Sequence, residues 1–102
     1  MRQVFSILVN NHPGVLSHVA GLFTRRSYNI ETIVATPTED KTITRIVIVS
    51  QGEEVKLNQI AKQLRKLYDV SFVETVPYDT EETKELLISI LNTSIFDSKN
   101  GE

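Results

Sequence analysis

The chain contains six segments whose apolar residues follow one of two periods. Four segments are rich in branched and aromatic residues and have the pattern of strands, at residues 2–9, 29–36, 42–50 and 70–76. Two others carry apolar residues at helical spacing, one beginning at residue 14 and one spanning residues 53–68. The predicted order is therefore strand, helix, strand, strand, helix, strand.

This order is that of the ferredoxin-like α+β fold, a four-stranded antiparallel sheet with two helices on one face. Right-handed crossovers place the first and third strands in the centre. Apolar residues on both faces of residues 2–9 agree with an interior strand. The second strand, residues 29–36, is predicted to lie at an edge. Its apolar centre carries no lysine and no proline, so we expect it to pair with a second copy in a homodimer.

Each predicted helix has one apolar stripe. The first is formed by Val15, Leu16, Val19, Leu22 and Phe23, and the second by Leu57, Ile60, Ala61, Leu64 and Leu67. Asn11 or His12 occupies the expected N-cap position, and Pro13 is expected in the first helical turn. Gly21 costs helix stability, and a close contact between helix and sheet is the expected reason for it.

Length and composition limit the possible classes of protein. The chain has 102 residues, of which 40% are hydrophobic, so we expect one globular domain at residues 1–78 and a C-terminal extension at 79–102. It contains no cysteine, which fits a cytoplasmic location. A net charge of -2 gives no long-range attraction to nucleic acid or an anionic membrane, and no segment approaches the ~20 apolar residues of a membrane span.

The extension is harder to interpret. Its segment LLISIL is predicted as either a fifth strand or a short helix, because six residues do not separate the two periods. The closing SKNGE is expected to be a frayed tail.

Few residues suggest catalysis. His12 and His18 have no cysteine or neighbouring carboxylate in the sequence with which to form a metal site, so surface or capping roles are favoured. No phosphate-binding glycine motif or nucleophile motif is present. We therefore predict no catalytic residue, no metal ligand and no cofactor in this chain.

The segment NNHPG, which leads into the first helix, has chemistry suited to a small ligand. The free amides of Gly14, Val15 and Leu16 lie at the positive end of the helix dipole, where anions bind. Asn11 adds an amide that both donates and accepts. On these residues alone, a binding site for an amino-acid carboxylate and a merely well-capped turn carry equal weight.

The same residues resemble the ACT domain, in which a strand is followed by Asn/Asp-x-Pro-Gly-Val-Leu and a helix, here residues 11–16. More specifically, ILVNNHPGVLSHVAGLFTRRSYNIETI and the later IAKQLRKLYDV are similar to the small regulatory subunits of acetohydroxyacid synthase, also called acetolactate synthase. The resemblance covers roughly residues 3–76.

The resemblance implies a non-catalytic subunit that binds and activates a thiamine-diphosphate-dependent catalytic subunit. It also implies feedback inhibition by valine or a related branched-chain amino acid. Thiamine diphosphate, Mg²⁺ and FAD would belong to the catalytic subunit. The effector site would lie between two ACT domains, with residues from both chains. One chain would supply Asn11, Gly14, Val15, Leu16 and Ser17, and the other Asn29 and Ile30.

Two other functions stay open: a free-standing ACT amino-acid sensor for another enzyme or transporter, and a small ferredoxin-like enzyme that uses His12 or His18. Longer family members carry a second domain, and TKELLISIL is similar to its first strand. The chain is expected to be either a short form or a truncated copy, and the HPG of the loop favours the short form.

Overall fold

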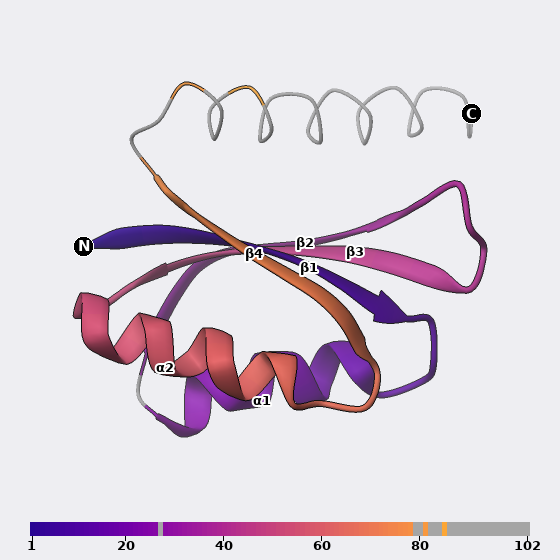
Figure 1. The fold of residues 1–102 in the computed structure, drawn as a ribbon, viewed down its shortest axis with the longest axis horizontal. Helices are drawn as coiled ribbons and strands as arrows, with labels where there is room; N and C mark the ends of the chain where they lie inside the picture. Colours follow the sequence, from indigo (N-terminus) through magenta and orange to yellow (C-terminus); the bar gives the residue numbers. More distant parts are fainter. Residues whose placement is uncertain (27, 79–80, 82–84, 86–102) are drawn as a thin grey trace.

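The computed structural model describes residues 1–26, 28–78, 81 and 85. Its elements are β1 (Arg2–Asn10), α1 (Val15–Arg25), β2 (Asn29–Pro37), β3 (Ile43–Gln51), α2 (Glu54–Arg65) and β4 (Val70–Pro77). The strands form one antiparallel sheet in the order β2-β3-β1-β4, and both helices cover the same face of it (Figure 1). The predicted order of elements and the edge position of the second strand are confirmed.

Strand β1 is paired along both of its sides. It pairs with β3 along its whole length, from Arg2 opposite Gln51 to Asn10 opposite Ile43, and its other side pairs with β4. Apolar side chains of β1 are buried on both faces of the sheet, which confirms the interior position predicted for this strand.

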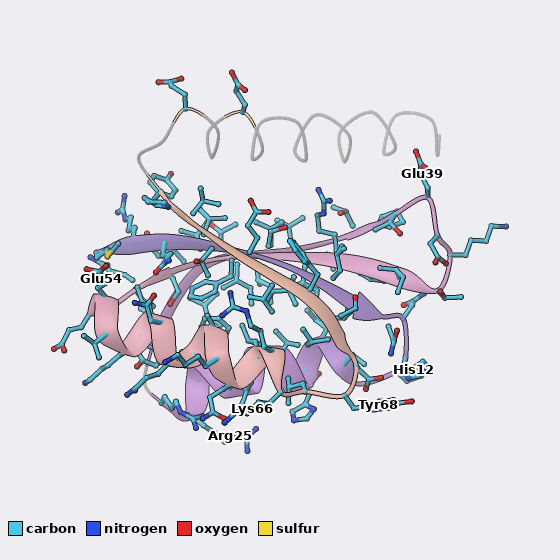
Figure 2. The ribbon with its side chains drawn as sticks, viewed as in Figure 1. His12, Arg25, Glu39, Glu54, Lys66 and Tyr68 are labelled. Carbon is cyan, nitrogen blue, oxygen red and sulfur yellow. The ribbon has the colours of Figure 1, made fainter. Side chains whose placement is uncertain are left out.

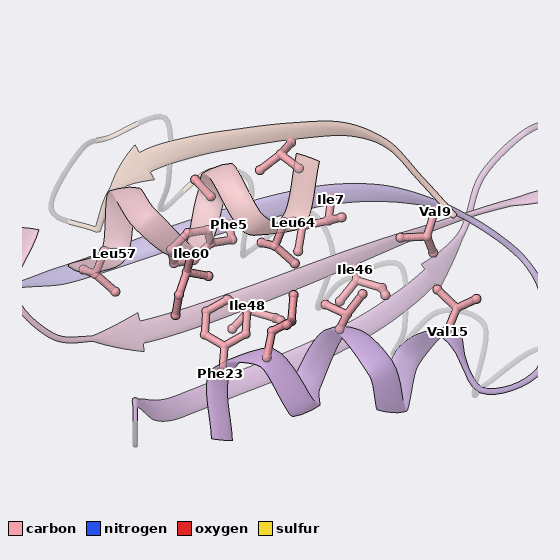
Figure 3. Close-up of a cluster of buried hydrophobic side chains, with 14 residues drawn as sticks. Phe5, Ile7, Val9, Val15, Phe23, Ile46, Ile48, Leu57, Ile60 and Leu64 are labelled. Atoms are coloured by element: carbon pink, nitrogen blue, oxygen red, sulfur yellow. The ribbon is translucent and has the colours of Figure 1, made fainter. Parts of the chain in front are cut away.

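The main core lies between the sheet and the two helices (Figure 3). Phe5 of β1 and Phe23 of α1 meet edge to face, with ring centroids 5.1 Å apart and an interplanar angle of 81°. Full burial of one such side chain contributes roughly 1.5–3 kcal/mol, so this contact is a strong link between helix and sheet. The buried residues of this cluster are Phe5, Ile7, Val9, Val15, Val19, Leu22, Phe23, Ile46, Ile48, Leu57, Ile60, Ala61, Leu64 and Val73.

A smaller apolar cluster lies apart from the main core and is formed by Val4, Val47 and Val49. Strand β2 has an irregularity at Glu31, since Ile30 pairs with Ser50 while Thr32 pairs with the next residue, Val49. This bulge changes which side chains of β2 face the helices.

Two details of the helix predictions are wrong. Helix α2 ends at Arg65 instead of residue 68, because the next amides, of Lys66 and Leu67, bond carbonyls only three residues back and tighten the last turn. Leu16 is 44% exposed and lies outside the core. The buried stripe of α1 is Val15, Val19, Leu22 and Phe23, whose spacing of four, three and one residues keeps them on one side of the helix.

The expected helix–sheet contact at Gly21 is also absent. A Cβ placed on Gly21 would approach only the flexible guanidinium of Arg25, at 3.7 Å. A Cβ on Gly14 would have nothing within 4 Å, but φ at Gly14 is 86°. The two glycines thus have similar space and different backbone conformations.

Nearly all of the C-terminal extension falls outside the described residues, including the segment LLISIL and the tail SKNGE. The division after residue 78 therefore stays a prediction. Within the part of the chain that the structure describes, no helix is long and apolar enough to cross a membrane.

We predict that Gly21→Ala stabilises the protein by about 0.5–1 kcal/mol, since the helix gains a better helix former without a clash. Gly14→Ala should destabilise it by about 1–2 kcal/mol, because an L-residue is strained at positive φ. Urea unfolding followed by circular dichroism measures both. If both substitutions changed the free energy of unfolding equally, or if Gly21→Ala were the less stable variant, this interpretation of the two backbones would be wrong.

Candidate functional site

The chain passes from β1 to α1 through a tight turn at residues 12–15. The amide of Val15 donates to the carbonyl of His12 at 3.3 Å, and Gly14 has φ 86° and ψ -9°. These angles belong to the third position of a type II turn, in which proline is common at the second position. Pro13 and Gly14 therefore form the turn, and the prediction that Pro13 begins the helix is wrong.

Gly14 is the N-cap of α1, and no side chain caps the helix. The prediction of a cap at Asn11 or His12 is therefore also wrong. The amide of Val15 is used by the turn, but no acceptor among the described residues bonds the amides of Gly14, Leu16 or Ser17. With no acidic residue in its first turn, α1 presents free donors and the positive end of its dipole.

A cavity of about 150 Å³ opens beside this helix start. Its buried wall is apolar and includes Val9, Val15 and Ile46. Backbone and side-chain polar groups surround that wall, so the cavity combines an apolar base with hydrogen-bonding groups, as small-ligand sites do. The lining residues are Val9, Asn10, Asn11, His12, Val15, Leu16, Ala35, Thr44 and Ile46.

Two neighbouring turns hold the rim of the cavity. The amide of Asn11 donates to the carbonyl of Thr42, in the β2–β3 turn, at 2.7 Å. The amide of Asn10 donates to the carbonyl of Asp69, in the α2–β4 turn, at 2.8 Å. Figure 2 shows His12 at the same end of the molecule as Tyr68, the residue before Asp69. The rim is therefore anchored through its backbone on two sides.

The charges near the cavity come from these turns. In the β2–β3 turn, hydrogen bonds from the hydroxyl and then the amide of Thr42 lower the pKa of Asp40 below its ordinary value. In the α2–β4 turn, Asp69 lies beside His12, whose Nδ1 is 3.2 Å from Oδ1 of Asp69. No cluster of three or more potential metal-ligating His, Cys, Asp or Glu side chains occurs in the described ranges.

The structure brings together part of the predicted set. Asn11, Val15 and Leu16 line the cavity, and Gly14 and Ser17 belong to the same turn and helix start without lining it. Asn29 and Ile30 are not there: Asn29 lies opposite Gln51, whereas Ala35, which lines the cavity, lies opposite Ile46. Ala35 lies six positions after Asn29 along the strand, or about 20 Å away.

Asn29 and Ile30 have structural contacts of their own within the chain. The carbonyl of Asn29 accepts a hydrogen bond from the hydroxyl of Ser50 at 3.0 Å, and Ile30 packs against the main core. Neither residue can therefore reach the helix start of its own chain.

Sequence reasoning missed six of the lining residues: Val9, Asn10, His12, Ala35, Thr44 and Ile46. A signal for some of them existed. Once strands one and three are predicted as antiparallel neighbours, the end of the first strand must face the beginning of the third. Val9 indeed lies opposite Thr44. The sequence does not give the exact register of the two strands, which decides whether Thr44 or one of its neighbours lines the cavity.

Comparison with known proteins decides the family. The model of the AHAS small subunit-like ACT domain matches residues 5–71. The chain belongs to this family. It is 40% identical over 94 residues to the acetolactate synthase isozyme 3 small subunit of Escherichia coli, covering 92% of this chain and 58% of that protein. The acetolactate synthase small subunit of Buchnera aphidicola is 42% identical, covering 92% of this chain and 60% of its own length.

Solved structures agree with this assignment. The acetolactate synthase small subunit from Thermotoga maritima superposes with a TM-score of 0.70 at 37% identity, covering 79% of this chain and 50% of that one. The ACT domain from GTP pyrophosphokinase of Chlorobium tepidum, with a TM-score of 0.64 at 22% identity over 74% of this chain and 97% of that one, shares the fold. The predicted ferredoxin-like ACT fold is confirmed. The chain spans less than two thirds of the curated small subunits named above.

Proposed function

We propose that this ACT domain is the regulatory part of an acetolactate synthase, acting in the cytoplasm in branched-chain amino-acid synthesis. It would bind and activate the catalytic subunit and make it sensitive to valine or a related amino acid. Catalysis would belong to the catalytic subunit, which would also bind the cofactors thiamine diphosphate, Mg²⁺ and FAD. The observation that carries the proposal is a small cavity beside a helix start with free amides, in a domain of this family.

The chemistry of the cavity suits a branched-chain amino acid. The free amides at the start of α1 can bind a carboxylate. The apolar wall of Val9, Val15 and Ile46 can hold a branched side chain out of water. Side-chain oxygens of Asn11 and Thr44 are acceptors for an ammonium group.

The cavity is bordered by the free edge of the sheet. Ala35 belongs to β2, which pairs with β3 along one edge. Along its second edge, β2 has no strand beside it in the described chain. Ile33, on the same strand, is 40% exposed. Pairing of two β2 edges around a two-fold axis would cover this strand and continue the sheet.

Such pairing also accounts for Asn29 and Ile30. Two antiparallel copies of β2 place the beginning of one strand beside the end of the other. Asn29 of the second copy would then lie near Ala35 and the cavity of the first, although it is about 20 Å from Ala35 in its own chain. The placement of Asn29 and Ala35 near opposite ends of one edge strand supports the proposal of a shared effector site.

We expect light scattering to show a dimer at roughly tens of micromolar protein, a concentration above the dissociation constant of a weak dimer. Ile33→Lys should raise the dissociation constant at least about tenfold, because it places a charge in the seam. Phe72→Lys is the matched control, since Phe72 is similarly exposed, at 48%, on the opposite edge strand β4. A monomeric wild type, or equal effects of the two lysines, would argue against the β2 seam.

Gly14→Asp should abolish feedback while leaving activation of the catalytic subunit. The added carboxylate would repel that of the effector, raising the valine concentration for half inhibition by about tenfold or more. The positive φ of Gly14 strains any replacement, so Gly14→Asn is the control: asparagine has nearly the same shape without the charge, and tolerates this conformation best. Acetolactate formation by the mixed subunits is measured across a valine titration. If the Gly14→Asp variant were half-inhibited at the same valine concentration as wild type, the turn at Gly14 would have a structural role and would not bind the effector.

Asn29→Ala should weaken valine inhibition with the fold intact, and mixing of variants tests whether the site is shared. In a mixed dimer of Gly14→Asp and Asn29→Ala chains, one site contains both changes and the other contains neither. Co-expressed variants should therefore recover part of the inhibition that each variant alone loses. Asn58→Ala, on the exposed side of α2, is the control for Asn29. No recovery in the mixture would indicate sites built within single chains.

The second candidate function is a free-standing ACT sensor for another enzyme. The same cavity would serve it, so the two functions differ in the partner. Capture of the acetolactate synthase catalytic subunit by the immobilised chain supports the main proposal. Amino-acid binding without such capture supports the sensor.

A further inference from the structure

Strand β4 is the second edge strand of the sheet, and its outer edge has backbone groups available for pairing. In the described sheet β4 pairs with β1 alone, so one of its two edges has no strand beside it. The carbonyl of Val73 lies on that outer edge, because it accepts a hydrogen bond from Nη2 of Arg65, on α2, at 3.4 Å. Backbone groups alternate between the two edges along a strand, so Thr75 directs its amide and carbonyl the same way. The outer edge of β4 can therefore pair with an added strand.

A cavity of about 300 Å³ lies along this edge. It is lined by Arg65, Val70, Ser71, Phe72 and Val73. The cavity thus combines a cationic side chain with the ring of Phe72, which is 48% exposed. It shares no lining residue with the cavity at the start of α1, so the two are separate sites.

The side of α2 beside β4 is basic. Lys62, Arg65 and Lys66 are three and four residues apart, which places them on one side of the helix. All three side chains are exposed, and no ion pair involves them within the described residues. Helix α2 packs beside β4 (Figure 1), so this basic side lies next to the outer edge. Glu74 of β4 points to the opposite face of the sheet, because its neighbour Val73 faces the helices.

We propose that the outer edge of β4 binds an extended acidic segment of the catalytic subunit, which joins the sheet as a further strand. This inference rests on the proposed function and names the surface that meets the partner. The backbone of the segment would pair with Val73 and Thr75, and an Asp or Glu side chain would bind the guanidinium of Arg65. Arg65 would exchange its hydrogen bond to Val73 for this carboxylate, which leaves the Val73 carbonyl to the added strand.

Charge argues against a second copy of this chain as the occupant. Two copies paired through β4 around a two-fold axis would bring their basic sides together, and like charges repel. The other alternative is that Arg65 protects the edge, since charged side chains on edge strands prevent pairing. The two roles predict opposite effects of removing the charge: loss of a partner if Arg65 binds it, and new association if Arg65 protects the edge.

The test measures binding of the full chain to the acetolactate synthase catalytic subunit by biolayer interferometry, and activation of acetolactate formation in parallel. Arg65→Glu should raise the Kd at least about tenfold, because it replaces an attraction by a repulsion. Lys56→Glu is the matched control, since it makes the same change of charge about two and a half turns earlier on α2, on the opposite side of the helix. It should leave the Kd within about twofold of wild type, as expected for an exposed charge outside the contact.

A backbone substitution tests strand addition separately from charge. Thr75→Pro removes an amide that the added strand would bond and that β1 does not use, and it should weaken binding about fivefold, the effect of one hydrogen bond. Thr75→Val retains the amide and is the control. Urea unfolding of both variants checks that the fold survives, and if Thr75→Pro does not fold, the comparison of Arg65→Glu with Lys56→Glu decides.

The outcomes separate this proposal from the one on which it rests. Equal binding by Arg65→Glu and wild type, or an equal loss in Lys56→Glu, would overturn the role of Arg65. Association of Arg65→Glu chains beyond the dimer, without loss of the catalytic subunit, would show that Arg65 protects the edge. Equal binding by folded Thr75→Pro and Thr75→Val would overturn strand addition. If the wild-type chain bound valine but no catalytic subunit, the proposed regulatory subunit would fail, and this proposal with it.

Discussion

The pairing of β1 along both sides is the constraint on which the rest of the structure depends. Nine consecutive pairs with β3, together with β4 on its other side, fix where β1 ends. That end determines the position of residues 11–14 and so of the first turn of α1. The edge-to-face contact between the rings of Phe5 and Phe23 then holds α1 against the same strand. Cavity and core are thus positioned by one strand, and a shift in its register would move both.

Much of this architecture could be predicted from the sequence because it depends on period and order. Alternating and helical spacings located all six elements, and the crossover rule placed β2 at the edge. The errors lie where local geometry overrides pattern. Pro13 and Gly14 were compatible with a helix start, but a positive φ at Gly14 makes them a type II turn. Leu16 fits the apolar stripe by type, yet its direction from the helix leaves it beside the cavity.

The candidate site was predictable only in part, for a related reason. Asn11, Val15 and Leu16 are close in sequence to the helix start, so a local motif could identify them. Ala35, Thr44 and Ile46 come from strands distant in the chain, and their contribution depends on register to within one residue. The contact between His12 and Asp69 joins residues more than fifty positions apart. No period or motif reports such a pair, and only the folded chain brings its members together.

The position of Ala35 on β2, the edge strand of the described sheet, has a thermodynamic consequence. If the second copy completes the cavity, an effector binds the dimer and not the separated chains. Ligand binding and self-association are then linked by mass action, and each strengthens the other by the same free energy. The apparent affinity for the effector would depend on how much of the protein is present. The sensitivity to an effector would therefore change with the abundance of this chain, without any change in the cavity itself.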